Sequence, residues 1–241
     1  MFMGCATPSR TTRERLLAAA GDLFAERGFH RTTVRDIAAR AGVNLASGHY
    51  HYGSKKDLYL AVLRAQFADV RSRLAARGAS LASAAPNRLS RRELEALLEA
   101  RIATMLEVLI GPPPGRHGTL MQREMTDPSE ALPVIVEEFI VPMKREMEEI
   151  VSRCVPGLDR EQVERCGLSI VGQATFYRFA TPAMLRILER SAYPAGFARA
   201  VARHIASFSL GGMERLAARA QPAGAMAHGP RRHTRRGARR A

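Results

Sequence analysis

Apolar residues recur every three or four positions along most of this chain, and this spacing predicts amphipathic helices. Segments that alternate apolar and polar residues with a period of two are few, and Ala, Leu, Arg and Glu dominate the sequence. We therefore predict an all-α fold. Long helices are expected over residues 91–110, 129–154, 160–179 and 196–220, and the second of these should bend or break before Pro142.

Capping signals mark four helices near the N-terminus. Thr11 and Glu14 form a capping box at the start of the first helix, and Gly28 stands where a left-handed residue would end it. Thr33 begins the second helix, and Gly42 ends it about two turns later. The third and fourth helices are expected over residues 44–51 and 55–76.

Proline and glycine divide the rest of the chain. The segment GPPPG, residues 111–115, cannot be helical, because consecutive prolines lack backbone donors and have a fixed φ. A helix over residues 117–125 is expected to stop at Asp127-Pro128, and a short helix is expected to follow Pro182.

The stretch TVRDIAARAGVNLASGHYHYGSK, residues 33–55, predicts two short helices joined by a turn that contains Gly42. This is the layout of a helix-turn-helix unit. The second helix of such a unit enters a major groove, so its first residues must let the backbone approach the base edges. The residues that meet this requirement are Asn44, Leu45, Ala46 and Ser47. We predict that they contact double-stranded DNA.

Further residues of the same stretch are candidates for contacts with DNA phosphates. Tyr50 carries a hydroxyl, and Lys55 begins a helix whose free N–H groups favour an anion. Thr33 occupies the same kind of position one helix earlier. Arg35 and His49 complete the predicted set, and for His49 both DNA contact and packing within the domain stay open.

The segment TRERLLAAAGDLFAERGFHRTTVRDIAARAGVNLASGHYHYGSKKDLYLAVL resembles the N-terminal DNA-binding domain of the TetR family of transcriptional regulators. The later segment LMQREMTDPSEALPVIVEEFIVPMKREM resembles the C-terminal domain of the CecR branch of that family. Gly48 and Tyr52 depart from the usual pattern, in which a large apolar residue and Phe stand at these positions.

The resemblance implies a homodimer that binds a palindromic operator and is released from it by a small-molecule effector, most often as a repressor. It places the dimer contact on the last two long helices, residues 160–179 and 196–220. Gly167, Gly172 and Ala174 would let helices approach closely there; the alternative is that these residues pack within one subunit.

The resemblance also implies an effector pocket among the C-terminal helices. Methionine is adaptable and suits a pocket of variable contents, although Met and Phe at helical spacing are also typical of plain core. The predicted ligand-binding residues are Met105, Met121, Met125, Phe139, Met143, Gln173, Phe176 and Tyr177, and Arg178 is a further polar candidate.

These observations divide the chain into four parts. A flexible N-terminus covers residues 1–9, the DNA-binding domain covers 10–55, and the effector-binding and dimerisation domain covers 56–220. A disordered, arginine-rich tail covers 221–241 and carries six arginines and no acidic residue.

The charge leaves a second function open. The net charge of the chain is +14, so a polyanion, either nucleic acid or a membrane surface, is an expected partner. The alternative to a sequence-specific regulator is therefore a nonspecific polyanion binder that depends on its basic residues.

Several other classes are disfavoured. No apolar run approaches the roughly 18 residues of a membrane span, and three cysteines without a CxxC motif are typical of reduced thiols, so we expect a cytoplasmic protein. Catalytic motifs such as a P-loop, GxSxG or HExxH are missing from the sequence. The HYHY motif gives no metal site, since residues two apart on a helix do not face each other. We predict no enzymatic activity, cofactor or metal.

Overall fold

The computed structural model describes residues 11–81, 89–111 and 116–220, apart from the side chains of residues 47–50, 116, 117 and 220. No strand occurs in these ranges, and the predicted all-α fold is confirmed. The helices are α1 (Thr12–Arg27), α2 (Val34–Ala41), α3 (Leu45–Tyr52), α4 (Lys55–Ala76), α5 (Arg91–Ile110), α6 (Arg116–Thr126), α7 (Leu132–Ile135), the π-helical η2 (Val136–Ile140), α8 (Val141–Cys154), α9 (Arg160–Phe179), α10 (Thr181–Ile187) and α11 (Phe197–Ala220).

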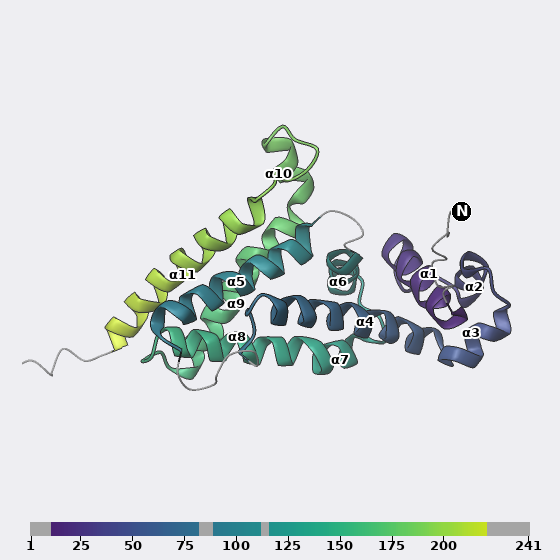
Figure 1. Cartoon of the computed structure of the whole chain (residues 1–241), viewed down its shortest axis with the longest axis horizontal. Coiled ribbons are helices and arrows are strands. Elements are labelled where there is room, and N and C mark those ends of the chain that lie inside the picture. Colours follow the sequence, from purple (N-terminus) through teal and green to yellow (C-terminus); the bar gives the residue numbers. More distant parts are fainter. Residues whose placement is uncertain (1–10, 82–88, 112–115, 221–241) are drawn as a thin grey trace, which may run out of the picture.

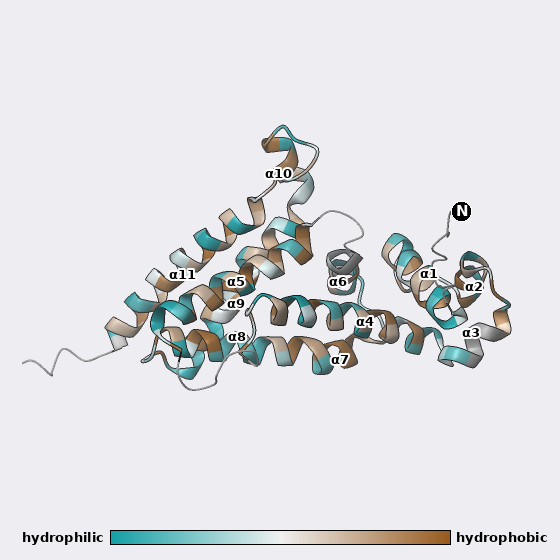
Figure 2. Cartoon of the chain, in the orientation of Figure 1, coloured by the Kyte–Doolittle hydropathy of each residue, from teal (hydrophilic) through white to brown (hydrophobic). Residues whose placement is uncertain are grey.

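The molecule is elongated, with α1, α2 and α3 at one end (Figure 1). The long helix α4 runs from this end into the larger group of helices, alongside α7 and α8. Helix α11 forms the opposite edge, and α10 projects from the bundle. Hydrophilic and hydrophobic positions alternate along the long helices, which is the pattern of amphipathic packing (Figure 2). None of the described helices is both long and apolar enough to cross a membrane.

The predicted capping residues act as caps. The Thr11 side chain accepts a hydrogen bond from the Glu14 N–H at 3.2 Å, and the Glu14 carboxylate accepts one from the Thr11 N–H at 2.9 Å. Gly28 follows α1 with φ of 80°, and its N–H bonds to the Phe24 carbonyl. Because these signals are local, the sequence predicted most helix ends to within two residues.

One predicted helix start was wrong. The helix expected from residue 129 begins at Leu132, because the Ser129 hydroxyl and N–H both bind the Glu124 carboxylate at 2.9 Å and hold Ser129 in a turn. The expected interruption before Pro142 is confirmed as η2, where the Val141 N–H bonds to the Val136 carbonyl, five residues back. Proline has no N–H to continue the α-helical ladder. The predicted GPPPG break lies largely outside the described residues, since 112–115 are not described.

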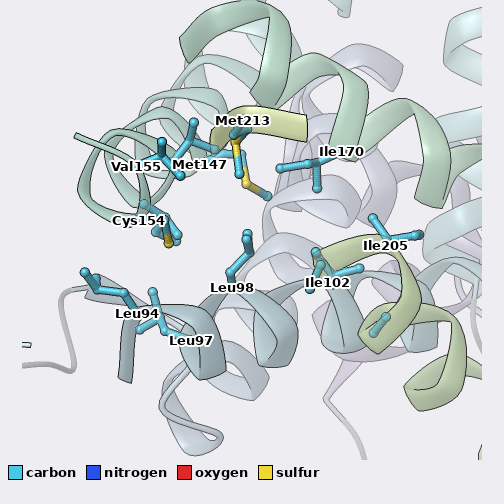
Figure 3. Packing of buried hydrophobic residues seen from close by; sticks show 14 of the residues in the cluster. Leu94, Leu97, Leu98, Ile102, Met147, Cys154, Val155, Ile170, Ile205 and Met213 are labelled. Atoms are coloured by element: carbon cyan, nitrogen blue, oxygen red, sulfur yellow. The ribbon is translucent and has the colours of Figure 1, made fainter. Parts of the chain in front are cut away.

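One hydrophobic core joins the C-terminal helices (Figure 3). Leu98 and Ile102 of α5 meet Ile170 of α9 and Ile205 of α11, and all four are at most 1% exposed. Cys154 lies in the same core as a free thiol, and burial raises its pKa to about 11.

A second core joins the N-terminal helices to later segments. Phe24 of α1 packs edge-on against Tyr59 of α4, with ring centroids 4.8 Å apart. Leu120 of α6 and Phe139 of η2 belong to the same cluster. The predicted domain boundary at residues 55 and 56 falls at the start of α4, but the first half of α4 packs in this N-terminal core.

Phe139→Ala tests whether this side chain is structural rather than a ligand contact. The Phe139 ring is 4% exposed and stacks on Phe67 at 4.1 Å, so its removal leaves a cavity. We expect the free energy of unfolding, measured by urea denaturation, to fall by about 3–5 kcal/mol. Glu137→Ala on the exposed side of η2 is the control and should change it by less than about 0.5 kcal/mol. An equally small effect of Phe139→Ala would contradict the packing role.

Candidate functional site

The turn between α2 and α3 is held by a helix-ending motif. Gly42 adopts φ of 64° and ψ of 40°, the left-handed conformation that glycine adopts without strain. The Val43 N–H bonds to the Ala38 carbonyl at 3.0 Å, and the Val43 side chain packs on the N-terminal core. The turn therefore sets the direction in which α3 leaves α2.

The N-terminal residues of α3 face away from the core. Asn44, Leu45 and Ala46 are exposed, and Leu45 is 43% exposed although it is large and apolar. The Asn44 side-chain oxygen accepts a hydrogen bond from the Ala46 N–H at 3.2 Å and so caps the helix. The amide NH₂ of Asn44 stays available for an outside acceptor. Helix α3 lies at the end of the molecule opposite α11 (Figure 1).

Three of the predicted DNA contacts fall on side chains that the structure does not describe. The backbone of Ser47, His49 and Tyr50 is helical within α3, but the side-chain positions of all three lie outside the described residues.

Basic and hydroxyl groups lie near the start of α2. The Thr33 hydroxyl accepts a hydrogen bond from the Asp36 N–H at 3.1 Å, so the candidate phosphate contact at Thr33 is also a helix cap. The hydroxyl and the N–H of Thr33 both donate to the Asp36 carboxylate, at 2.7 and 3.3 Å. These bonds, with the charges of Arg27 and Arg35, hold the pKa of Asp36 below its usual value. Arg31 and Arg35 are exposed and form no ion pair among the described residues, which leaves both charges available to an anion.

Lys55 and Tyr52 form hydrogen bonds within the N-terminal domain. The Lys55 ammonium donates to the Phe29 carbonyl at 3.0 Å and lies 4.2 Å from the centre of the Phe29 ring. An ammonium has three donors, so a phosphate contact at Lys55 remains compatible with this bond. The Tyr52 hydroxyl donates to the Arg13 carbonyl at 3.0 Å, a bond that Phe at this position could not make.

A cavity of about 340 Å³ lies between α4, α5, α6, α8 and α9. Four of the predicted ligand-binding residues line it, namely Met105, Met121, Met125 and Met143. Met147, which the sequence did not single out, is a fifth methionine in the wall. The volume is within the range of small-molecule sites, and the wall is adaptable.

The other four predicted ligand-binding residues do not line this cavity. Phe139 lies behind Phe67, which does line it. The Gln173 amide donates to the Ser209 hydroxyl of α11 at 3.3 Å, and Tyr177 packs edge-on against Phe197 at 5.7 Å. Phe176 is 55% exposed. These three residues of α9 face α11 or solvent, because helical rotation carries them away from the lining positions Val171, Thr175 and Arg178.

Charged groups in the wall were mostly missed from the sequence. Arg101 is 4% exposed and its guanidinium lies 2.9 Å from the Glu146 carboxylate. The Lys144 ammonium lies 2.5 Å from Glu148 and 3.0 Å from Glu164. The spacing of Lys144 and Glu148 signals a helical ion pair, but their place beside a cavity depends on tertiary packing. Within the described residues, no group of His, Cys, Asp and Glu could hold a metal ion.

Helix α6 contacts the N-terminal helices with the side opposite the cavity. The Arg123 guanidinium donates to the carbonyls of Ala25 and Glu26, at 2.9 and 2.7 Å, at the end of α1. The Tyr59 hydroxyl donates to the buried Glu124 carboxylate at 2.9 Å. Burial and the Glu124 charge raise the pKa of Tyr59, so its phenol stays protonated. A shift of α6 would therefore move both contacts.

The outward sides of α9 and α11 carry large apolar side chains next to glycines. Phe176 is 55% exposed and Phe208 is 68% exposed. A Cβ added at Gly172, Gly211 or Gly212 would meet no atom within 4 Å. Gly167 and Ala174 are instead buried, and Gly167 lies against Met147 and Glu148, which favours the alternative of packing within one subunit for these two residues.

Two known families match the chain. Residues 16–62 match the family described as "Bacterial regulatory proteins, tetR family". Residues 94–213 match "HTH-type transcriptional dual regulator CecR, C-terminal domain".

Individual relatives agree with these matches. The chain is 33% identical over 144 residues to the "HTH-type transcriptional dual regulator CecR" of Shigella flexneri, a match that covers 58% of this chain and 63% of that protein. It is 45% identical over 60 residues to the "HTH-type transcriptional repressor KstR2" of Mycolicibacterium smegmatis, covering 24% of this chain and 29% of that protein. The matched regions span less than two thirds of either relative.

Solved structures share the architecture. A transcriptional regulator from Rhodococcus sp. Rha1 superposes with a TM-score of 0.59 at 19% identity, covering 85% of this chain and 98% of that one. At this level of identity the likeness concerns the fold alone.

Proposed function

Because this chain belongs to the TetR family of bacterial regulatory proteins and carries a CecR-type C-terminal domain, we propose that it is a sequence-specific DNA-binding transcriptional regulator acting in the cytoplasm. The observation that carries the proposal is the exposed N-terminus of α3 behind a turn closed by Gly42. In this geometry α3 enters a major groove, and Asn44, Leu45, Ala46 and Ser47 approach the base edges.

Phosphate contacts hold the domain in register. Arg35, Thr33 and Lys55 lie at the starts of α2 and α4, and His49 and Tyr50 extend the contact surface along α3. Backbone N–H groups at helix starts also favour an anion. These contacts supply affinity for any sequence, whereas the first residues of α3 supply the preference for one.

We propose that two copies of the chain pair through α9 and α11. Phe176, Phe208 and Leu216 are exposed apolar side chains on these helices, at 55%, 68% and 39%. Exposed glycines inside a helix cost about 1 kcal/mol each relative to Ala, and Gly211 and Gly212 have no close neighbour within the subunit. Pairing with a second copy explains both features. The glycines allow a helix of the partner to approach closely, and the aromatic rings pack into the grooves of that helix.

The cavity supports control by a small-molecule effector. Met121 and Met125 of α6 line it, while Arg123 of α6 holds the end of α1. An effector that displaces α6 would therefore change the setting of the DNA-binding helices in the dimer. Loss of about 100-fold in operator affinity requires roughly 2.7 kcal/mol of coupling between the two sites. We propose that the chain is a repressor that its effector releases.

The decisive test of DNA recognition is selection of bound genomic fragments followed by footprinting. We expect an inverted repeat whose half-sites are centred roughly 34–36 Å apart or a multiple of that distance. The alternative, nonspecific binding through basic residues, is tested by deleting residues 221–241. A specific regulator keeps its preference for the repeat over random DNA, whereas protection without any repeat, or loss of nearly all binding on deletion, favours the alternative.

Asn44→Ser and Arg35→Ala form a matched pair for base and phosphate contacts. Serine can still cap α3, but it lacks the amide group of Asn44. We therefore expect the discrimination between bases to fall by about 1–3 kcal/mol at one base pair per half-site. Arg35→Ala should weaken binding to all sequences and reduce the slope of log affinity against log salt by about 0.9. Competition binding at several salt concentrations measures both. If Arg35→Ala altered sequence preference alone, the proposed docking would be wrong.

Phe208→Glu tests the pairing surface. A carboxylate on this face would be buried without a partner in the dimer, so we expect dissociation to monomers in analytical ultracentrifugation. Operator affinity should fall at least about tenfold, because a monomer contacts only one half-site. Ser72→Glu adds the same charge to the exposed side of α4 and should leave the dimer intact. A fully dimeric Phe208→Glu protein would exclude this interface.

A further inference from the structure

Among the described side chains, three cationic groups line the cavity, and two of them have counter-charges within the chain. The Arg101 guanidinium is 2.9 Å from Glu146. The Lys144 ammonium is shared between Glu148 and Glu164. Neither group needs a ligand to balance its charge.

Arg178 is the third cation and has no such partner. One guanidinium nitrogen, Nη2, donates to the Thr119 hydroxyl at 2.7 Å, and the buried Nε has no acceptor. No carboxylate pairs with Arg178 among the described residues, and every Asp and Glu of the chain lies within them. Burial lowers the pKa of Arg178, and no neighbouring charge opposes this. A partly desolvated cation with an unused donor is unfavourable until an anion joins it.

A glycine rather than a larger residue faces the unpaired Nε of Arg178. Gly118 of α6 lies beside it, and a Cβ at that position would come within 3.3 Å of Arg178 Nε and 2.7 Å of the Leu109 carbonyl. Any other residue would therefore crowd the guanidinium and press on α5. Glycine keeps this end of the cavity open next to the unused donor.

Between Arg178 and the charged groups around Lys144, most residues that line the cavity are apolar. Glu164 and Arg178 lie near opposite ends of the part of α9 that lines the cavity, roughly 21 Å apart along the helix axis. Leu168 and Val171 lie between them, and the Thr175 hydroxyl donates to the Val171 carbonyl at 2.7 Å. The two carboxylates around Lys144 make the Glu164 end net negative, so an anionic group is favoured only at the Arg178 end.

We propose that the cavity binds an elongated amphipathic monoanion, an apolar body that ends in a carboxylate, with the carboxylate paired to Arg178 and the body against the methionines. This inference rests on the proposed function, because it names the chemical class of the effector of that cavity. A paired carboxylate beside Gly118 and Thr119 also contacts α6 directly, which is the helix that holds α1.

The test measures head-group preference by isothermal titration calorimetry on the full chain without DNA. The probes are hexanoate, decanoate, dodecanoate and 4-phenylbutanoate, with decanol and decylamine as neutral and cationic matches, all below their micelle concentrations. We expect at least one of the longer carboxylates to bind, and decanoate to bind at least about tenfold more tightly than decanol, as a charge-assisted hydrogen bond predicts. Binding by none of the carboxylates, equal affinities of decanoate and decanol, or tightest binding of decylamine would overturn the proposal.

Variants locate the head group. Arg178→Met should abolish the preference for decanoate while leaving the affinity for decanol unchanged, and Arg165→Met, an exposed arginine of the same helix, should leave both unchanged. Val171→Trp fills the cavity and should abolish binding of every probe. If Arg178→Met fails to fold, Arg178→Gln removes the charge while keeping a donor for Thr119. A preference for decanoate that survives loss of the Arg178 charge contradicts the assignment.

The outcomes separate this inference from the proposed function. Decanoate binding is measured without DNA. A failure to find an inverted repeat would therefore contradict the proposed regulatory function without affecting the proposed pairing of a carboxylate with Arg178. Specific operator binding without any head-group preference would support the proposed regulatory function and contradict the proposal that the effector is an anion.

Discussion

The two-sided packing of α6 is the constraint on which the rest of the structure depends. One side of α6 lines the cavity with Met121 and Met125. The other side places Leu120 in the N-terminal core and Arg123 on the last carbonyls of α1. Because a single helix of three turns does both, the cavity and the DNA-binding helices cannot move independently.

Buried polar groups make this junction specific as well as stable. Glu124 is 2% exposed and accepts hydrogen bonds from Tyr59, Ser129 and the Ser129 backbone. A buried carboxylate is tolerated only when its acceptors are used, so these donors fix the position of α6 relative to α4. Arg101 and Glu146 act similarly between α5 and α8, where Glu146 also binds Ser80 and the Leu81 N–H of the loop after α4.

The exposed or unpaired groups of one subunit lie where outside partners are proposed. Asn44 and Arg35 are exposed at the end of the molecule that carries α3, Phe208 is exposed on α11, and Arg178 lacks a counter-charge in the cavity. The exposed Phe208 ring and the unpaired Arg178 are unfavourable in an isolated subunit, whereas Asn44 and Arg35 are solvated. The proposed partners account for them: DNA for Asn44 and Arg35, a second copy for Phe208, and an anionic effector for Arg178. The intrasubunit core is otherwise well packed around Leu98 and Ile170.

Sequence by itself determined the elements and the DNA-binding unit. Thr11, Thr33 and Gly42 act through bonds to residues only a few positions away, so local patterns predicted the helix ends and the helix-turn-helix. Tertiary structure alone decided which residues face the cavity. Met121 and Tyr177 were both candidates from the sequence, but the rotation of α9 against α11 turns Tyr177 away from the cavity and brings Arg178 into its wall. Helical periodicity shows which face of a helix is apolar. Which helix packs against that face depends on contacts between residues far apart in the chain.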